Sequence, residues 1–97
     1  MIKLALFVTL EVIPGKQEEL EQFLGVGRIL AEQEQGTITW YAFKLGPTAY
    51  GIFDTFKKEE DRQGHLSGGI ARTLMKIAPE LLASPPDIQQ ADVIAAK

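Results

Sequence analysis

The feature that most constrains this chain is the stretch from Gly36 to Phe56, GTITWYAFKLGPTAYGIFDTF, which predicts two apolar strands joined at residues 45–48. Side chains alternate between the two faces of a strand, yet neither face of these strands is purely polar. The stretch also holds the only Trp and both Tyr of the sequence. A hairpin of this kind needs cover on both faces, so the rest of the chain is expected to pack around it.

The segments on either side of the hairpin predict the remaining elements. Residues 2–13 alternate at strand period, and residues 16–35 have the apolar spacing of a helix that ends at Gly36. Residues 57–82 predict a helical segment loosened by glycines in its middle, with a last short turn at 79–82, and a weaker strand at 87–95. The order β-α-β-β-α-β predicts an α+β, ferredoxin-like sandwich, with a four-stranded antiparallel sheet and two helices on one face.

Composition narrows the class of protein. The 97 residues fit a single domain spanning 1–97. A net charge of −3 argues against a nucleic-acid partner, and the lack of cysteine excludes disulfides and fits a cytoplasmic protein. No stretch approaches the roughly 20 apolar residues that a membrane span needs. The opening MIKLALFVTL is expected to be a first strand rather than a signal peptide, because Glu11 ends the apolar run and no cleavage site follows.

Two helices can cover only one face of the predicted sheet. Phe7 lies opposite the leucine row of its strand, and the neighbours Trp40 and Tyr41 must point to opposite faces. A bare second face with large aromatic side chains would be an exposed apolar patch, which marks an interaction surface. We therefore expect a homodimer joined through the sheet face, with a ligand cleft between the sheet and its helices.

The residues able to carry chemistry are few. His65 is the only histidine, and without a second ligand at suitable spacing no metal site is expected. Asp54 ends a strand eleven residues earlier, so the two side chains can meet at the mouth of the sheet. The carboxylate could then orient the imidazole and raise its pKa, which suits a phenolic proton acceptor. The alternative is a half-buried structural histidine that caps the helix or forms a hydrogen bond at the dimer edge.

Candidate substrate-binding residues surround this pair. One of Trp40 and Tyr41 faces the helices and the other could line a cleft, unless both belong to the core and dimer interface. Phe7 is a further candidate from the first strand. Arg28, the one charge close to the apolar stripe of the first helix, is either a surface residue with a packed stem or an anion clamp.

Three short motifs resemble a known family. They lie at the first strand-to-helix turn, before the second strand, and from the third strand into the next helix: Val12-Ile13-Pro14-Gly15-Lys16, Glu34-Gln35-Gly36-Thr37, and Asp54-Thr55-Phe56 with Glu59-Glu60 and His65-Leu66. In this order, and over nearly the whole chain, they resemble the antibiotic biosynthesis monooxygenase family of the dimeric α/β-barrel superfamily.

The resemblance implies a homodimer whose sheets form a barrel and a cleft in each subunit. Relatives oxidise electron-rich phenols or quinols with molecular oxygen, often without metal or flavin, so no cofactor is implied. His65 would accept the proton, Asp54 would orient it, and Trp40 or Tyr41 would form a cleft wall. Asp54 is shorter than the family's usual Glu, and the absence of Asn argues against the haem-degrading activity of one branch.

The expected function is therefore a cofactor-independent monooxygenase acting on a small phenol or quinol. Two alternatives stay open, so the chain's status as an enzyme is not decided by its sequence. One is a non-catalytic dimeric barrel that binds a small apolar or aromatic molecule, such as a stress-related protein. The other is a structural module whose cleft is filled by its own side chains.

Overall fold

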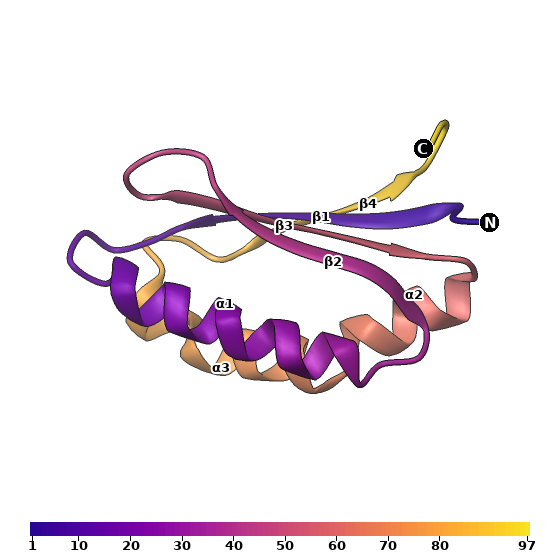
Figure 1. The fold of residues 1–97 in the computed structure, drawn as a ribbon. Helices are drawn as coiled ribbons and strands as arrows, with labels where there is room; N and C mark the ends of the chain where they lie inside the picture. Colours follow the sequence, from indigo (N-terminus) through magenta and orange to yellow (C-terminus); the bar gives the residue numbers. More distant parts are fainter.

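The computed structural model describes residues 1–97, and its elements follow the predicted order (Figure 1). The α+β, ferredoxin-like fold class is confirmed. In chain order the elements are β1 (Leu4–Glu11), α1 (Gln17–Glu32), β2 (Thr37–Lys44), β3 (Ala49–Phe56), α2 (Glu59–Leu66), α3 (Gly69–Leu81) and β4 (Asp87–Asp92).

The four strands form one antiparallel sheet in the order β2-β3-β1-β4. The long alternating strand β1 therefore lies inside the sheet, while β2 and β4 form its edges. All three helices lie on the same side of the sheet, and the opposite side is left bare by this chain (Figure 1). The two-layer arrangement follows from the sequence, because α1 and α3 each have one apolar stripe to bury.

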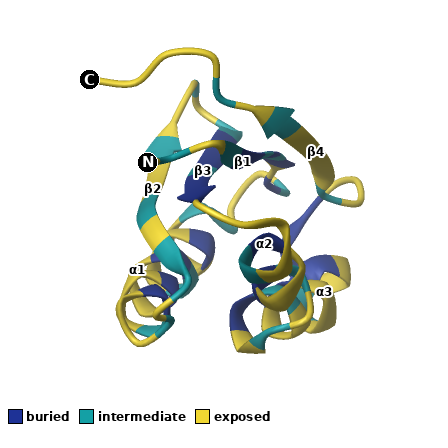
Figure 2. Ribbon diagram, turned by 90° about the vertical axis from the view of Figure 1, so that its right-hand side faces the viewer, coloured by how far each residue is buried: buried dark blue, intermediate teal, exposed yellow.

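The core occupies the layer between the sheet and the helices, where the buried positions in Figure 2 are concentrated. It combines the inward row of β1 with residues of α1, β3, α3 and the turn after α3. Each fully buried aliphatic side chain of this kind contributes about 1.5–3 kcal/mol. The largest cluster contains Val8, Leu10, Val12, Leu20, Leu24, Tyr50, Ile52, Leu74, Ala78, Leu81 and Leu82.

The second helical segment breaks in the predicted place, between α2 and α3 at Ser67–Gly68. A side chain at residue 68 would meet the Glu34 carboxylate at 3.2 Å, so the close approach favours glycine here. The short turn expected at 79–82 is wrong, because α3 continues through Pro79 to Leu81. Pro79 and Met75, four residues earlier, are both exposed, so the carbonyl that loses its helical partner stays near water.

The outer face of the sheet carries aromatic side chains, as expected. Phe7, Phe53 and Tyr41 lie in register across three strands, and Phe7 stacks on Phe43 with ring centroids 6.5 Å apart. Tyr41 is 57% exposed. None of the helices combines the length and apolar character needed to cross a bilayer.

Candidate functional site

The inner side of α2 is unusual because both of its buried residues, Arg62 and His65, are ionisable. Their i, i+3 spacing places the two side chains on one face of the helix. Four of the other six residues in the EEDRQGHL sequence are polar or charged, and Leu66 is the one large apolar residue. Polar contacts, rather than a stripe of apolar side chains, therefore hold α2 on the sheet.

His65 lies between two carboxylates. Its Nδ1 is 2.6 Å from Oε1 of Glu34, and its Nε2 is 2.7 Å from Oδ2 of Asp54. Glu34 comes from the connection between α1 and β2 and also accepts a hydrogen bond from the Thr37 hydroxyl at 2.7 Å. The ring of Phe56 packs against the imidazole, with centroids 5.5 Å apart. The structure thus brings Asp54 and His65 together as the sequence predicted, and adds a third member.

Glu34 was missed as a partner of His65, although the sequence carries a sign of it. Glu34 falls on the same helical stripe as the apolar residues of the first helix, where a carboxylate needs a polar partner. Its partner is 31 residues away in the chain, and only the folded sheet brings the two together.

The charge of His65 follows from its two neighbours. A neutral imidazole has one N–H, so only the doubly protonated ring can donate toward both Glu34 and Asp54. Burial lowers the pKa of His65, but the hydrogen bonds and charges of Asp54 and Glu34 outweigh burial and raise that pKa above 6.5. In this geometry neither ring nitrogen is open to a substrate. The arrangement does not support the role of proton acceptor that the resemblance implies for His65.

Asp54 lines the same cavity as His65 and is the more deeply buried of the two. Its side chain is 1% exposed. Its Oδ2 forms the ion pair with His65 at 2.7 Å, so Oδ1 is the carboxylate oxygen that has no polar partner. A buried acceptor left unpaired costs about 1–3 kcal/mol. Asp54 therefore offers an unused acceptor to a ligand that carries a hydroxyl or N–H group.

A small cavity adjoins this carboxylate, between the sheet and the helices α2 and α3. Its volume is about 80 Å³, and ten of its twelve lining residues are apolar. The indole N–H of Trp40, another wall residue, is buried without a partner. No group of three or more His, Cys, Asp or Glu side chains is arranged to hold a metal ion. The lining residues are Leu6, Val8, Trp40, Ile52, Asp54, His65, Leu66, Ile70, Ala71, Leu74, Met75 and Ile88.

Of the four candidate substrate-binding residues, only Trp40 lines this cavity. Tyr41 points to the outer face because it is the next residue in the strand, and Phe7 stacks on Phe43 on that same face. Arg28 is exposed and forms an ion pair with Glu32, one helical turn further on. Phe7, Tyr41 and Arg28 thus lie outside the cavity beside His65, whereas Arg28, Trp40 and Tyr41 together line a separate hollow of about 390 Å³ between α1 and β2.

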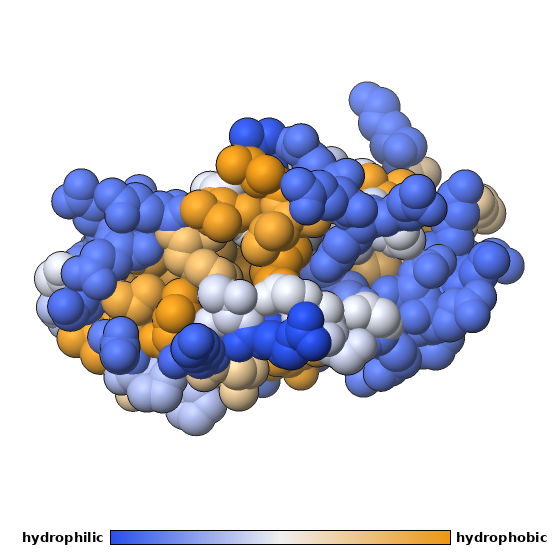
Figure 3. Space-filling model, turned by 90° about the horizontal axis from the view of Figure 1, so that it is seen from below, coloured by the Kyte–Doolittle hydropathy of each residue, from blue (hydrophilic) through white to orange (hydrophobic).

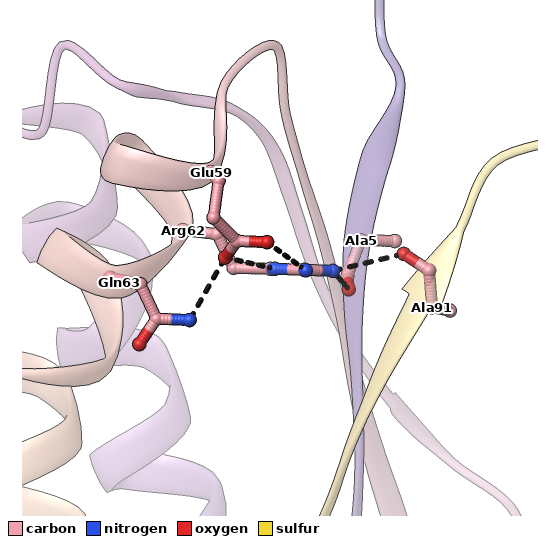
Figure 4. Close-up of polar contacts among 5 residues, drawn as sticks. All are labelled: Ala5, Glu59, Arg62, Gln63 and Ala91. Carbon is pink, nitrogen blue, oxygen red and sulfur yellow. Dashed lines mark hydrogen bonds and ion pairs between the residues drawn. The ribbon is translucent and has the colours of Figure 1, made fainter.

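The Arg62 side chain holds α2 against the sheet (Figure 4). Its Nη1 donates to the backbone carbonyls of Ala5 at 3.3 Å and Ala91 at 3.1 Å, which lie on β1 and β4. Its Nε donates to Glu59 at 3.0 Å, and its Nη2 contacts the other oxygen of the same carboxylate. Arg62 is 6% exposed. The helix is thereby joined to two strands by a charge that does not titrate in the physiological range.

Solved structures of several other proteins have the same fold as this chain. A protein of unknown function from Nitrosomonas europaea is 49% identical and aligns over 100% of this chain and 94% of its own, with a TM-score of 0.97. A proposed antibiotic biosynthesis monooxygenase from the same organism is 15% identical over 95% of this chain and 90% of its own, with a TM-score of 0.85. One from Deinococcus radiodurans is 15% identical over 97% and 95%, with a TM-score of 0.86. Neither a family model nor a curated protein matches the sequence.

The fold is that of the proteins named as antibiotic biosynthesis monooxygenases, so the resemblance drawn from the sequence motifs is confirmed. An identity of 49% over the whole chain is high enough to show a shared family. This chain belongs to the same family as that Nitrosomonas europaea protein of unknown function.

Proposed function

We propose that this protein is a cofactor-independent monooxygenase that acts on a small phenol or quinol in the cavity beside Asp54. The observation that supports this most directly is the buried Asp54 carboxylate, whose Oδ1 has no hydrogen-bond partner in the wall of an apolar cavity. A phenolic hydroxyl is a donor attached to an apolar ring, and it complements both features. The names of structural relatives point to the same general chemistry.

In the proposed reaction the Asp54 carboxylate, rather than His65, accepts the hydroxyl hydrogen of the substrate. As that proton moves to the carboxylate, electron density rises on the ring and becomes available to oxygen. One oxygen atom enters the ring and the other leaves as water, while a phenol becomes a quinone. The substrate supplies all the electrons, so the equation balances as phenol plus O₂ giving quinone plus water, and as hydroquinone plus O₂ giving hydroxyquinone plus water.

His65 acts in this proposal as a positioning residue. Its protonated ring, held by Glu34 at 2.6 Å, keeps a positive charge 2.7 Å from one oxygen of Asp54. That contact fixes the carboxylate and leaves its other oxygen for the substrate. The neighbouring positive charge also stabilises negative charge that develops on the substrate oxygen.

Oxygen uptake with hydroquinone and simple phenols tests the proposal. The wild-type chain should consume oxygen faster than buffer with at least one of these compounds. Asp54→Asn should lower the excess rate by about 10²-fold or more, because the amide cannot accept the proton. Asp87→Asn is the matched control, since Asp87 is exposed at the start of β4 and does not line the cavity. Equal rates for wild type, Asp54→Asn and buffer would reject the enzyme.

The second candidate is a non-catalytic protein that binds a small aromatic molecule. It is favoured because each ring nitrogen of His65 already contacts a carboxylate, so the site has no free imidazole base. In that case phenols should quench the fluorescence of Trp40, the only tryptophan, in a saturable way. Saturable quenching without oxygen uptake would select this candidate over the enzyme.

A further inference from the structure

The cavity beside Asp54 is too small for the proposed ligand in its present form. Its volume is about 80 Å³, whereas an apolar cavity that takes up benzene measures about 150 Å³. A phenol is larger than benzene. One wall of the cavity must therefore move before an aromatic ring can enter.

The two helical walls differ in what holds them. α3 contributes Leu74, Ala78 and Leu81 to the main apolar core, so moving it would expose that core to water. α2 contributes no buried apolar side chain, and its wall residues are His65 and the half-buried Leu66. Seen from the helix side, the molecular surface is hydrophilic at the end where α2 lies and apolar nearer α1 and α3 (Figure 3). α2 is the wall that can move at the lower cost.

The chain around α2 also permits a local movement. The helix has eight residues, a length that is marginal without tertiary contacts. Glycines stand at positions 64, 68 and 69, within and just after its last turn. Arg62 stays charged at every relevant pH and holds the helix to β1 and β4. The segment free to swing is thus the C-terminal part that carries His65 and Leu66.

We propose that the C-terminal part of α2 is a hinged lid over the cavity and that His65, clasped in its protonated form between Glu34 and Asp54, is the latch that keeps the lid closed. This proposal rests on the proposed function for the identity of the ligand, but the movement itself belongs to the unliganded chain. Loss of the proton leaves one ring N–H for two carboxylates and a negative charge buried in the cavity wall without a counter-charge, which favours opening.

The groups that face the latch come from every neighbouring element. β3 supplies Asp54, and the connection between α1 and β2 supplies Glu34. From α2 itself Arg62 lies one turn away, pairs with Glu59, and is also within electrostatic reach of Asp92. Asp61 lies against Gly36, on the loop before β2. The latch is therefore one positive ring between two negative groups, and the cation of the same helix face, Arg62, already has its own partner.

The direction of the pH effect follows from the two states of the lid. In the closed lid Asp54 and Glu34 raise the pKa of His65 above 6.5, against the opposing effect of burial. In the open lid the ring meets water and its pKa returns to about 6.5. The latch is at full strength below about pH 6.5 and is lost as the pH rises through the higher pKa of the closed state.

Amide hydrogen exchange on the full chain, measured by NMR from about pH 5.5 to about pH 9, tests the lid. After correction for the intrinsic pH dependence of exchange, the opening equilibrium of amides 63–67 should rise about tenfold per pH unit between the two His65 pKa values. Amides 74–78 of α3 should show no such change. Glu34→Gln should raise the opening at low pH toward the wild-type value at high pH. Glu32→Gln, the same charge change at an exposed site, should have no effect.

The outcomes separate the lid from the proposed function. The lid is rejected if amides 63–67 and 74–78 open together. It is also rejected if the opening equilibrium of amides 63–67 does not change as His65 loses its proton, even when a phenol binds. The wild-type pH series decides this even if Glu34→Gln does not fold. If α2 opens alone with the expected pH dependence but no phenol quenches Trp40 or increases oxygen uptake, the lid stands and the proposed function fails.

Discussion

His65 is the only histidine of the chain, so its titration can be followed by NMR without ambiguity. Its ring protons should titrate with a midpoint above 6.5, because Asp54 and Glu34 together outweigh the effect of burial on the pKa. Since the folded pKa is raised, this group stabilises the fold fully below about pH 6.5, and that contribution is lost as the pH rises through the folded pKa. Glu34→Gln should lower the midpoint and Glu32→Gln should not. A midpoint below 6.5 in the wild type would contradict the geometry of the site.

Two glycines of α1 provide a second prediction at the residue scale. A Cβ at Gly27 would lie 3.2 Å from the Trp40 ring, whereas one at Gly25 would meet nothing within 4 Å. Gly27→Ala should push the indole toward the cavity, change its fluorescence and lower the free energy of unfolding by up to about 2 kcal/mol. Gly25→Ala should raise the free energy of unfolding by about 0.5–1 kcal/mol through helix propensity. Urea unfolding followed by circular dichroism measures both, and equal effects would show that Trp40 is not confined by α1.

At the scale of the elements, Arg62 is the main connection between α2 and the sheet. Replacing it by Met removes its bonds to Ala5, Ala91 and Glu59, and leaves two strand carbonyls without this donor. Arg62→Met should lower the free energy of unfolding by about 2–3 kcal/mol, since hydrogen bonds to charged groups contribute about that much. Arg72→Met, on the exposed side of α3, is the matched control and should change little. Chemical denaturation compares the two, and a similar small loss for both would contradict the anchoring role.

Most helices and strands could be predicted from the sequence because their apolar patterns are local. Alternation in the first strand and the hairpin, and the apolar stripe of the first helix, are local patterns that each impose one way of burying apolar surface. The prediction of a separate turn at 79–82 was wrong. It assumed that proline ends a helix, whereas Pro79 occupies an exposed position near the end of α3, which continues to Leu81. The expected strand at 87–95 ends earlier, at Asp92.

The candidate site was predicted only in part, because its contacts are not local. Asp54 and His65 are close in sequence and on adjoining elements, so their meeting could be foreseen. Glu34 joins them only through the packing of the α1–β2 connection against α2. Phe7, Tyr41 and Arg28 were candidates because of their places on the first two strands and the first helix, and the alternation of the strands separates the first two from the cavity.

At the scale of the whole molecule, the outer face of the sheet predicts a second copy of the chain. Phe7, Tyr41, Phe43 and Phe53 lie on that face, where no helix covers them. Phe43 packs over Gly51, so tightly that a Cβ there would lie 2.5 Å from the ring. Light scattering should give about twice the monomer mass of 10.7 kDa. Tyr41→Lys should shift the mass toward the monomer by placing a charge in the contact. A wild-type monomer would overturn this assignment of the outer face.

The central claim is that the cavity beside Asp54 binds a small aromatic hydroxyl compound, and a fluorescence titration of Trp40 tests it most directly. Hydroquinone should quench the emission to a saturating limit in the wild type and in Asp87→Asn. Asp54→Asn should bind about tenfold more weakly or worse, because the amide can turn its NH₂ group toward the hydroxyl and so offers a poorer acceptor. Quenching that rises linearly without saturation, and equally in all three proteins, would show that the ligand only collides with the surface and would contradict the account.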